Sequence, residues 1–142
     1  MDTPPPNIFT IIRYFLKQNT AYVYLTLTIL MSVYSQIVVR WRMSSRFANV
    51  HLPEGLREKF WFLLTVVFDP FIFSALAATF ISGVCWMATM TKLDVSYAYP
   101  FTSLVFVLVL AFSHLLLGEP FNAQKLLGVL LIMAGILVSS RG

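Results

Sequence analysis

Four long apolar stretches, separated by short polar segments, dominate the pattern along the chain. The predicted membrane-spanning helices cover residues 18–39, 70–91, 95–117 and 121–140, and none of them contains Asp or Glu. Each is close to the roughly 20 residues that a helix needs to cross a hydrocarbon core about 30 Å thick. Asp69 and Pro70 mark the second span, since Asp is a favourable N-cap and Pro a favourable first helical residue.

Short connections set the relative directions of these spans. Only residues 92–94 join spans two and three, and residues 118–120 join spans three and four. Helices joined so closely must run antiparallel. The sequence therefore predicts an all-α membrane protein with four transmembrane helices in a single domain, residues 1–142.

Two further segments combine a helical period of apolar residues with charges. In residues 7–17 the apolar side faces away from Arg13 and Lys17, and in residues 54–68 four charged residues precede a nine-residue uncharged stretch. This pattern is typical of helices that lie in the membrane interface. An alternative for residues 60–68 is that they prolong span two, with a bend at Pro70.

The composition supports a membrane protein. Of the 142 residues, 58% are hydrophobic and 11% charged, whereas a soluble domain has about a quarter charged residues. This excludes disorder and disfavours a soluble enzyme. The single cysteine, Cys85, excludes a disulfide framework, and two distant histidines do not make a zinc site. We predict no metal or other cofactor, and no enzyme activity, since no nucleophile–base pair is evident.

The positive charge is unevenly distributed. Five of the ten Lys and Arg residues fall within residues 40–59, which is not the footprint of a nucleic-acid-binding protein. With four spans, one side of the membrane holds four basic residues and the other six. The positive-inside rule then favours both termini outside, but the predicted interfacial segment supplies most of the excess, so the orientation stays open.

The second half of the chain carries a series of short motifs. These are Ala98-Tyr99-Pro100, Ser103-Leu104, Gly118-Glu119-Pro120, Gly128-Val129-Leu130 and Met133-Ala134-Gly135. Their order and spacing resemble the four-helix members of the drug/metabolite transporter superfamily, the branch that includes the small multidrug resistance proteins. Within it, the motifs look most similar to the paired subunits of the bacterial flippase for undecaprenyl-phosphate-linked aminoarabinose. The resemblance implies a multi-pass protein of the bacterial inner membrane that works as a dimer.

Span one distinguishes two kinds of transporter within this branch. Small multidrug exporters resemble one another in a mid-helix glutamate, and the corresponding position here is Ser32. A buried carboxylate can exchange a proton for a lipophilic cation because its pKa is tunable, whereas a serine hydroxyl cannot. The tryptophan that those exporters share corresponds to Thr102. Proton-coupled drug export is therefore disfavoured.

Span one also supplies candidate binding residues. Ser32, Gln36 and Arg40 follow at steps of four, so they face one side of a helix. They could form a polar groove in which the Arg40 guanidinium binds phosphate through parallel hydrogen bonds. The alternative is that Ser32 and Gln36 hold helices together and that Arg40 extends to lipid headgroups.

Span three and the turn after it supply the remaining candidates. Tyr97, Tyr99 and Ser103 flank Pro100, which should kink the helix and expose a backbone carbonyl. The hydroxyl groups beside this kink could line a sugar site, although Tyr97 could instead belong to an interfacial aromatic belt. Glu119 could pair with a basic residue near the membrane surface, or simply complement the dipole of the following helix.

Span four carries a packing signal. Gly128 and Gly135 allow close helix approach, and the resemblance implies that this span is the dimer seam. The partner could be a second copy or a similar four-helix subunit.

The resemblance, together with the absence of an acidic residue from the spans, implies a flippase, or flippase subunit, that translocates a polyprenyl-phosphate-linked sugar for modification of cell-envelope glycan or lipid A. The lipid-linked sugar and membrane lipids are the predicted ligands. Two alternatives are a small-multidrug-type exporter of small molecules or cations, and a non-transporting membrane adaptor for a glycosyltransferase.

Overall fold

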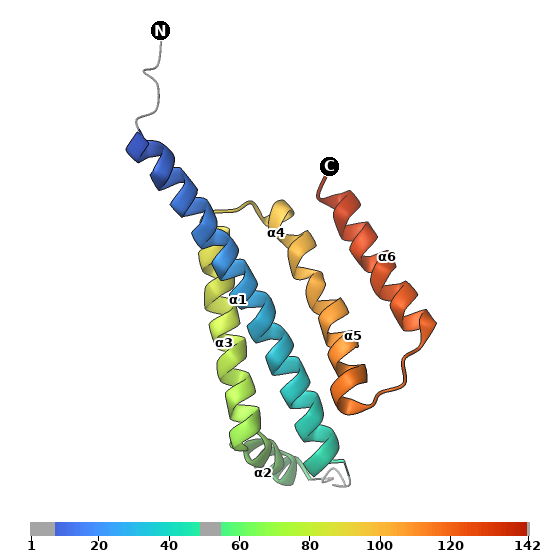
Figure 1. Ribbon diagram of the computed structural model, residues 1–142. Helices are drawn as coiled ribbons and strands as arrows, with labels where there is room; N and C mark the ends of the chain where they lie inside the picture. Colours follow the sequence, from blue (N-terminus) through green and yellow to red (C-terminus); the bar gives the residue numbers. More distant parts are fainter. Residues whose placement is uncertain (1–7, 49–54, 142) are drawn as a thin grey trace.

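Helices form almost all of the computed structural model, which describes residues 8–48 and 55–141, with side chains from residue 19 onward. The first helix, α1 (Ile8–Arg46), has 39 residues, and α3 (Pro70–Met90) packs along it in the opposite direction (Figure 1). The third limb consists of α4 (Val95–Thr102) and α5 (Leu104–Leu117), and α6 (Ala123–Ser139) runs back beside it. Neighbouring helices are antiparallel, as predicted.

The start of α1 differs from the prediction. A separate interfacial helix over residues 7–17 was expected, but α1 continues without a break from Ile8 through the first span. The reason is local, because residues 8–46 contain neither Gly nor Pro to interrupt a helix. Residue 7 and the side chains of residues 8–18 lie outside what the structure describes, so the amphipathic face expected there stays a prediction.

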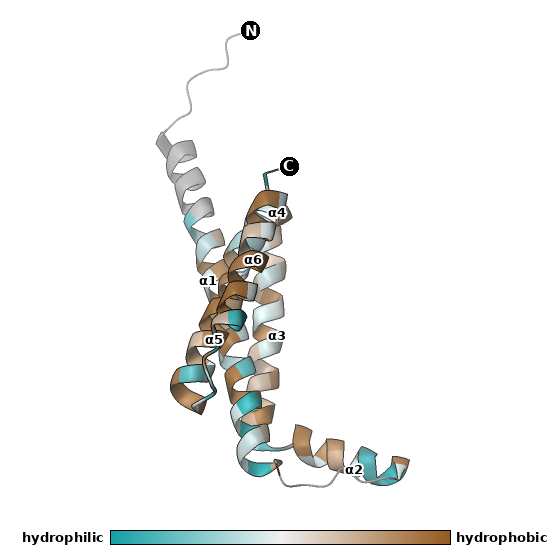
Figure 2. Cartoon of the chain, turned by 90° about the vertical axis from the view of Figure 1, so that its right-hand side faces the viewer, coloured by the Kyte–Doolittle hydropathy of each residue, from teal (hydrophilic) through white to brown (hydrophobic). Residues whose placement is uncertain are grey.

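The short helix α2 (Leu56–Val67) lies at the foot of the bundle and projects sideways from α3 (Figure 2). It does not prolong span two, because Phe68 and Asp69 separate the two helices. The Asp69 carboxylate accepts a hydrogen bond from the backbone N–H of Phe71, and Pro70 occupies the first turn of α3. The predicted N-terminal signal of span two is thereby confirmed. Residue 54, the predicted start of the interfacial segment, is outside the described residues.

Span three is broken where the sequence contains proline. Pro100 lies inside α4, and α5 begins after Ser103, whose buried hydroxyl donates to the carbonyl of Pro100. The helix is thus interrupted close to Pro100, a residue that lacks a backbone donor, while the exposure of a backbone carbonyl there stays a prediction. By length and composition, Asn19–Arg46, Pro70–Met90 and Val95–Leu117 can each cross a bilayer.

The fourth predicted span is shorter than expected. It was predicted to begin at residue 121 after Pro120, but α6 begins at Ala123, where the side chain of Asn122 accepts from the backbone N–H of Gln124. At 1.5 Å per residue, its 17 residues rise about 26 Å, a little less than the hydrocarbon core. A fourth crossing by α6 therefore stays a prediction.

The tightest packing lies between α1 and α3. Small side chains, including Ala21, Ala75 and Ala78, are buried there and let the backbones approach closely. The Ser82 hydroxyl donates to the carbonyl of Thr28 at 2.9 Å and accepts from the Ser32 hydroxyl at 2.8 Å. Polar groups thus bind these two helices together from inside.

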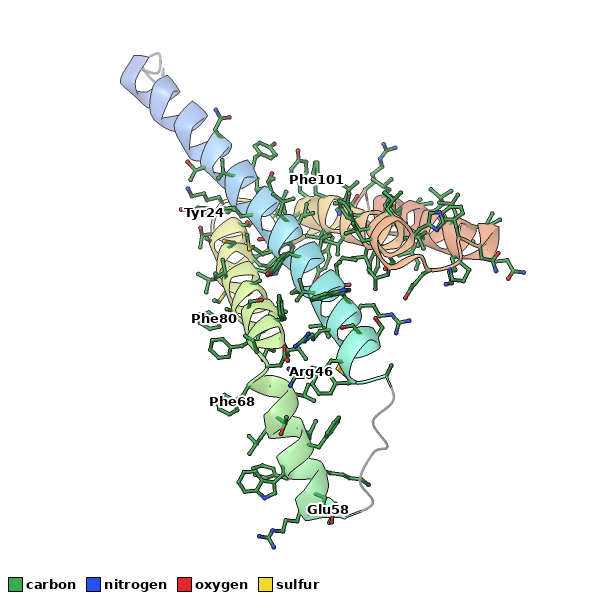
Figure 3. All side chains as sticks on the ribbon, turned by 60° about the horizontal axis from the view of Figure 1, so that its bottom comes forward. Tyr24, Arg46, Glu58, Phe68, Phe80 and Phe101 are labelled. Atoms are coloured by element: carbon green, nitrogen blue, oxygen red, sulfur yellow. The ribbon has the colours of Figure 1, made fainter. Side chains whose placement is uncertain are left out.

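A cluster of charges closes the lower end of the α1–α3 pair (Figure 3). Its centre is Asp69, whose side chain is fully buried. Arg42 binds both carboxylate oxygens, with Nε 2.9 Å from Oδ1 and Nη2 2.8 Å from Oδ2, and Arg46 Nη1 lies 2.8 Å from Oδ2. We call these three residues the Asp69 cluster. The hydrogen bonds from Arg42 lower the pKa of Asp69 from 3.8 to about 2, against the opposing effect of burial.

Candidate functional site

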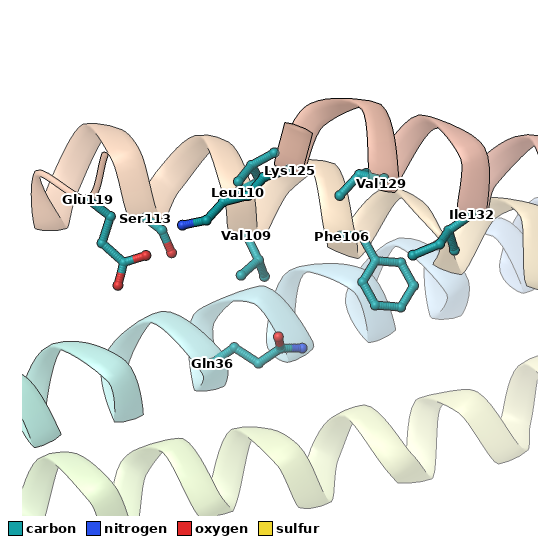
Figure 4. A pocket seen from close by; sticks show the side chains of 10 residues that line it. Gln36, Phe106, Val109, Leu110, Ser113, Glu119, Lys125, Val129 and Ile132 are labelled. Atoms are coloured by element: carbon teal, nitrogen blue, oxygen red, sulfur yellow. The ribbon is translucent and has the colours of Figure 1, made fainter. Parts of the chain in front are cut away.

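A mainly apolar cleft with a few polar side chains lies between α1, α5 and α6 near the lower end of the bundle (Figure 4). It has a volume of about 410 Å³, and its polar lining comes from Gln36 of α1, Ser113 of α5, Glu119 of the following turn and Lys125 of α6. The rest of the lining is apolar. A second hollow of about 580 Å³ shares Gln36 and Ser113 with the first and adds Arg40. We call the two hollows together the headgroup cleft, because they are contiguous through shared residues.

Arg40 and Glu119 meet at this cleft. Arg40 Nε lies 2.6 Å from Glu119 Oε1, and the two side chains are 62% and 28% exposed. The remaining guanidinium nitrogens of Arg40 make no hydrogen bond within the part of the chain that the structure describes. Arg40 is therefore held in place by one nitrogen while its other nitrogens remain free to bind an anion.

The turn that carries Glu119 is fixed by its backbone. Gly118 adopts a left-handed conformation with φ of 65°, which a side chain would strain. The backbone N–H of Glu119 donates to the Ser113 carbonyl, and His114 Nδ1 donates to the Glu119 carbonyl at 2.8 Å. The Gly118-Glu119-Pro120 motif thus has a geometric role, because it directs the Glu119 carboxylate toward α1.

The other predicted site residues lie elsewhere. At the upper end of the bundle, the Tyr97 hydroxyl is 3.1 Å from that of Tyr22. Tyr99 packs edge-on against Trp86 and borders a hollow of about 170 Å³ between α4 and α6. From Tyr97 to Leu117 the helices rise about 30 Å, so the tyrosines and the headgroup cleft lie near opposite ends.

Two predicted site hydroxyls are already engaged. Ser32 bonds to Ser82 between α1 and α3, and Ser103 bonds within the kink of span three. The structure therefore gathers Gln36, Arg40 and Glu119 in one place, Tyr97 and Tyr99 in another, and Ser32 and Ser103 in neither. The predicted polar residues of span one therefore do not form a single continuous groove.

Span four places its two glycines differently. Gly128 borders the headgroup cleft and Gly135 is exposed. A Cβ atom added at either position would meet nothing within 4 Å. Packing within the described part of this chain therefore does not require glycine at these positions.

Three residues of this lower end were not expected in the roles they have. Arg42 and Arg46 were not predicted to pair with a carboxylate, but both bind Asp69. Lys125 was not among the predicted binding residues, yet it lines the cleft. One signal was available, since Lys125 is the single formal charge in the four predicted spans, and ionisable residues within the membrane usually mark function. Ser113 gave no such signal.

An antiparallel bundle of apolar helices that encloses a charged cleft has the architecture of a multi-pass membrane transporter. Residues 8–141 match the EamA-like transporter family, and the chain belongs to this family, within the drug/metabolite transporter superfamily. It is accordingly a transporter protein and not an enzyme. No solved structure matches the chain.

Curated relatives narrow the likeness. Over 91 residues, 64% of this chain and 80% of the relative, it is 30% identical to a Pseudomonas savastanoi pv. phaseolicola protein named "Probable 4-amino-4-deoxy-L-arabinose-phosphoundecaprenol flippase subunit ArnE". Over 73 residues, 51% of this chain and 64% of the relative, it is 35% identical to the Pseudomonas aeruginosa protein of the same name. Over 69 residues, 47% of this chain and 55% of the relative, it is 42% identical to a Salmonella paratyphi B protein whose name differs only in ending with ArnF.

Proposed function

We propose that the chain is one subunit of a dimeric flippase that moves a polyprenyl-phosphate-linked sugar across the bacterial inner membrane, for modification of cell-envelope glycan or lipid A. The observation that carries this proposal is the headgroup cleft, where Arg40 presents free guanidinium nitrogens at the end of an otherwise apolar bundle. The names of the relatives supply the substrate class. We take the sugar to be an aminoarabinose.

The chemistry of the cleft suits such a headgroup. A guanidinium binds phosphate oxygens through paired hydrogen bonds, and the Gln36 amide can bond to a sugar hydroxyl. Glu119 holds Arg40 in position and offers a carboxylate to an amino sugar. The predicted spans contain no carboxylate that could exchange a proton for a lipophilic cation, which argues against drug export.

The opposite face of α1 suits the lipid tail. There α1 and α5 line an apolar groove of about 520 Å³, whose residues include Leu30, Ile37, Leu108 and Phe112. A polyprenyl chain could stay against this surface or in the surrounding lipid while the headgroup occupies the cleft. The tail then never has to leave an apolar environment.

The upper tyrosines would serve the other leaflet. Tyr97 and Tyr99 lie near the opposite end of the bundle with exposed side chains, where hydroxyl groups can receive a sugar. We assign Ser32 to the packing of α1 against α3 and Ser103 to the kink of span three, so both shape the path without touching substrate.

A dimer completes the path. The described part of one chain encloses a cleft at one end and a small hollow at the other, and no residue of α6 is buried. We propose that α6 packs against α6 of a partner, close to Gly128 and Gly135. The partner is a second copy or a similar four-helix subunit, in keeping with the word "subunit" in the relatives' names.

The decisive experiment is a flux assay in liposomes. The protein, alone and with any four-helix subunit that co-purifies with it, is reconstituted with labelled aminoarabinosyl phosphoundecaprenol. We expect translocation above that of empty liposomes, and a loss of at least about tenfold in the Arg40→Ala variant. Lys59→Ala, which removes an exposed charge of α2, is the matched control and should leave the rate unchanged.

Several results would contradict the proposal. Equal flux in liposomes with the wild-type protein and in empty liposomes would contradict the flippase function. Co-purification with a glycosyltransferase, without any lipid movement, would also contradict it. Full proton-coupled uptake of a lipophilic cation by the same vesicles would point to drug export instead.

A further inference from the structure

Three polar side chains without partners converge on the headgroup cleft from three different helices. They are Gln36 of α1, Ser113 of α5 and Lys125 of α6 (Figure 4). Across the part of the chain that the structure describes, the Gln36 amide, the Ser113 hydroxyl and the Lys125 ammonium form no hydrogen bond or ion pair. Of the three, only Gln36 was predicted from the sequence to be a binding residue.

Ser113 is the most informative of the three. Only 8% of its surface is exposed, so its hydroxyl is surrounded by protein except where it meets the cleft. Most serines and threonines of this fold donate to a carbonyl of their own helix, as Thr79 does to Ala75 and Ser140 to Leu137, whereas Ser113 does not. The Ser113 hydroxyl is open to the cleft and makes no hydrogen bond within the described residues, so it can donate to a ligand there.

Lys125 supplies a second positive charge. Its ammonium group is directed toward Ser113 in the cleft (Figure 4). Arg40 stands in the adjoining hollow, which shares Gln36 and Ser113 with the first. Two cations and the single carboxylate of Glu119 leave the cleft with a net charge of about +1, which attracts an anion and repels a cation.

Glu119 occupies the position that an anion would take. Its carboxylate lines the cleft and binds Arg40 Nε at 2.6 Å. A phosphate placed between Lys125 and Arg40 would compete with it for the guanidinium. The carboxylate could then turn toward the amino group of a sugar or toward water, since it sits in an exposed turn.

We propose that Lys125 and Ser113 form, with Arg40, a two-cation phosphate site in which the Glu119 carboxylate is a built-in competitor. Lys125 and Arg40 bind the phosphate oxygens, Ser113 donates its hydroxyl to them, and Glu119 releases Arg40 as the phosphate arrives. This proposal rests on the proposed function and specifies its site. The ligand is a phosphate group, either free or esterified to a lipid.

The test measures binding to the purified chain in lipid nanodiscs. The probes are undecaprenyl monophosphate, inorganic phosphate and the uncharged alcohol undecaprenol. For undecaprenyl monophosphate, Lys125→Ala should raise Kd about tenfold or more, and Ser113→Ala should raise it about threefold to tenfold. Lys125→Arg should restore binding, because it keeps the charge. Lys59→Ala removes the same charge outside the cleft and should leave Kd unchanged.

Glu119→Gln tests the competitor directly. Removing the carboxylate should lower Kd for undecaprenyl monophosphate severalfold, whereas a carboxylate that only positioned Arg40 would give weaker binding. Circular dichroism and thermal unfolding of every variant identify changes that come from misfolding. Lys125→Gln, which keeps much of the side-chain volume, replaces Lys125→Ala if the latter unfolds.

The outcomes separate this proposal from the proposed function. If Lys125→Ala binds like Lys59→Ala, the phosphate site is wrong, even where wild-type flux proceeds. If the variants change Kd as expected but the wild type moves no lipid, the site stands and the flippase proposal falls. The same variant pattern with inorganic phosphate alone supports a site for free phosphate, while equal binding of undecaprenol overturns the phosphate site altogether.

Discussion

Two guanidinium groups share one fully buried carboxylate in the Asp69 cluster, and this arrangement makes the fold sensitive to acid. The folded-state pKa of Asp69 lies below its unfolded value, so its contribution to stability is complete above about pH 3.8 and is lost as the pH falls toward about 2. Protonation would leave Arg42 and Arg46 without their counter-ion at the point where α1 meets α3.

The first prediction follows from this linkage. Asp69→Asn keeps an N-cap acceptor for Phe71 but removes the negative charge, so the variant should unfold at lower temperature than the wild type at neutral pH. The difference should shrink as the pH falls from 4 to 2, which thermal unfolding in detergent will measure. Asp94→Asn is the control, since Asp94 caps α4 without a side-chain hydrogen bond. A difference that persists unchanged to pH 2 would contradict the assigned role.

At the residue scale, the sequence predicts which side chains can bind a ligand better than it predicts which side chains pair with one another. Arg40 and Glu119 could be singled out by their types and positions, and the turn chemistry of Gly118 also follows from sequence. The rotation of α1 about its axis determines which arginine binds Glu119 and which two bind Asp69. The identity of a residue does not show this rotation. Ser113 of α5 could not be predicted as a site residue for the same reason. Its proposed role in binding depends on its position opposite Lys125 and Gln36 in the cleft.

At the scale of the helices, hydrogen bonds between hydroxyl groups contribute to the packing of α1 against α3. The Ser82 hydroxyl bridges the two helices by donating to Thr28 and accepting from Ser32. Hydrogen bonds between membrane helices contribute on average about 0.6 kcal/mol and at most about 1.7 kcal/mol. The bridge is therefore a modest stabilising contact that adds to the close approach of small side chains.

The second prediction concerns this bridge. Ser82→Ala should lower the free energy of unfolding by about 0.5–1.5 kcal/mol and leave substrate flux intact, because Ser82 faces α1 from α3 and does not line the cleft. Denaturant unfolding in mixed micelles, followed by circular dichroism, gives the difference. Ser45→Ala serves as the matched control, since that hydroxyl bonds only within its own helix. No loss of stability in Ser82→Ala would show that the two helices hold together without this bridge.

The short helix α2 exposes apolar side chains with no protein cover. Leu56, Phe60, Trp61 and Leu63 are all more than half exposed, and the helix projects sideways from the foot of α3 (Figure 2). An apolar face on such a helix is expected to lie at the boundary of headgroups and acyl chains. The predicted interfacial position accounts for this exposure.

The third prediction tests that position with tryptophan fluorescence. In a variant in which Trp41 and Trp86 are Phe, Trp61 should be quenched more strongly by lipids brominated close to the headgroup than by lipids brominated near the chain end. The comparison variant carries the substitutions Phe80→Trp and Trp61→Phe in the same background. Phe80 is chosen because it lies midway along α3 and points away from α1 (Figure 3). This variant should show the reverse order. Equal quenching of Trp61 at both depths would place α2 outside the interface.

Element boundaries show where sequence prediction reaches its limit. The start of α3 was predictable because Asp69 and Pro70 are strong local signals. The continuous α1 was not, since a change from charged to uncharged composition at residue 18 indicates a change of environment but does not break a helix. Likewise Pro120 invited an early start for α6, while the Asn122 side chain sets the start two residues later.

For the whole molecule, the distribution of charge follows the bundle's two ends. The start of α1 and the end of α6 lie at the upper end, with Lys92 and Arg141, while the headgroup cleft, the Asp69 cluster and α2 lie at the lower end (Figure 1). The short connections made this antiparallel arrangement predictable. They did not predict that the candidate binding residues lie at both ends of the bundle. Residues spaced four apart in the sequence share one face of a helix, but this spacing does not show which other helices that face contacts.

The fourth prediction concerns assembly. Gly135 is exposed, and a Cβ there would meet nothing within 4 Å, so a larger side chain should leave the fold of one chain unchanged. If α6 packs closely against a partner, Gly135→Leu should separate the backbones and shift native mass spectra from dimer to single chains. Flux should fall with it. Gly83→Leu on α3 is the matched control, because that glycine is equally open and exposed but lies away from the proposed seam. A dimer that survives Gly135→Leu while Gly83→Leu abolishes it would move the interface from α6 to α3, and the path proposed between two chains would then have to be rebuilt around that helix.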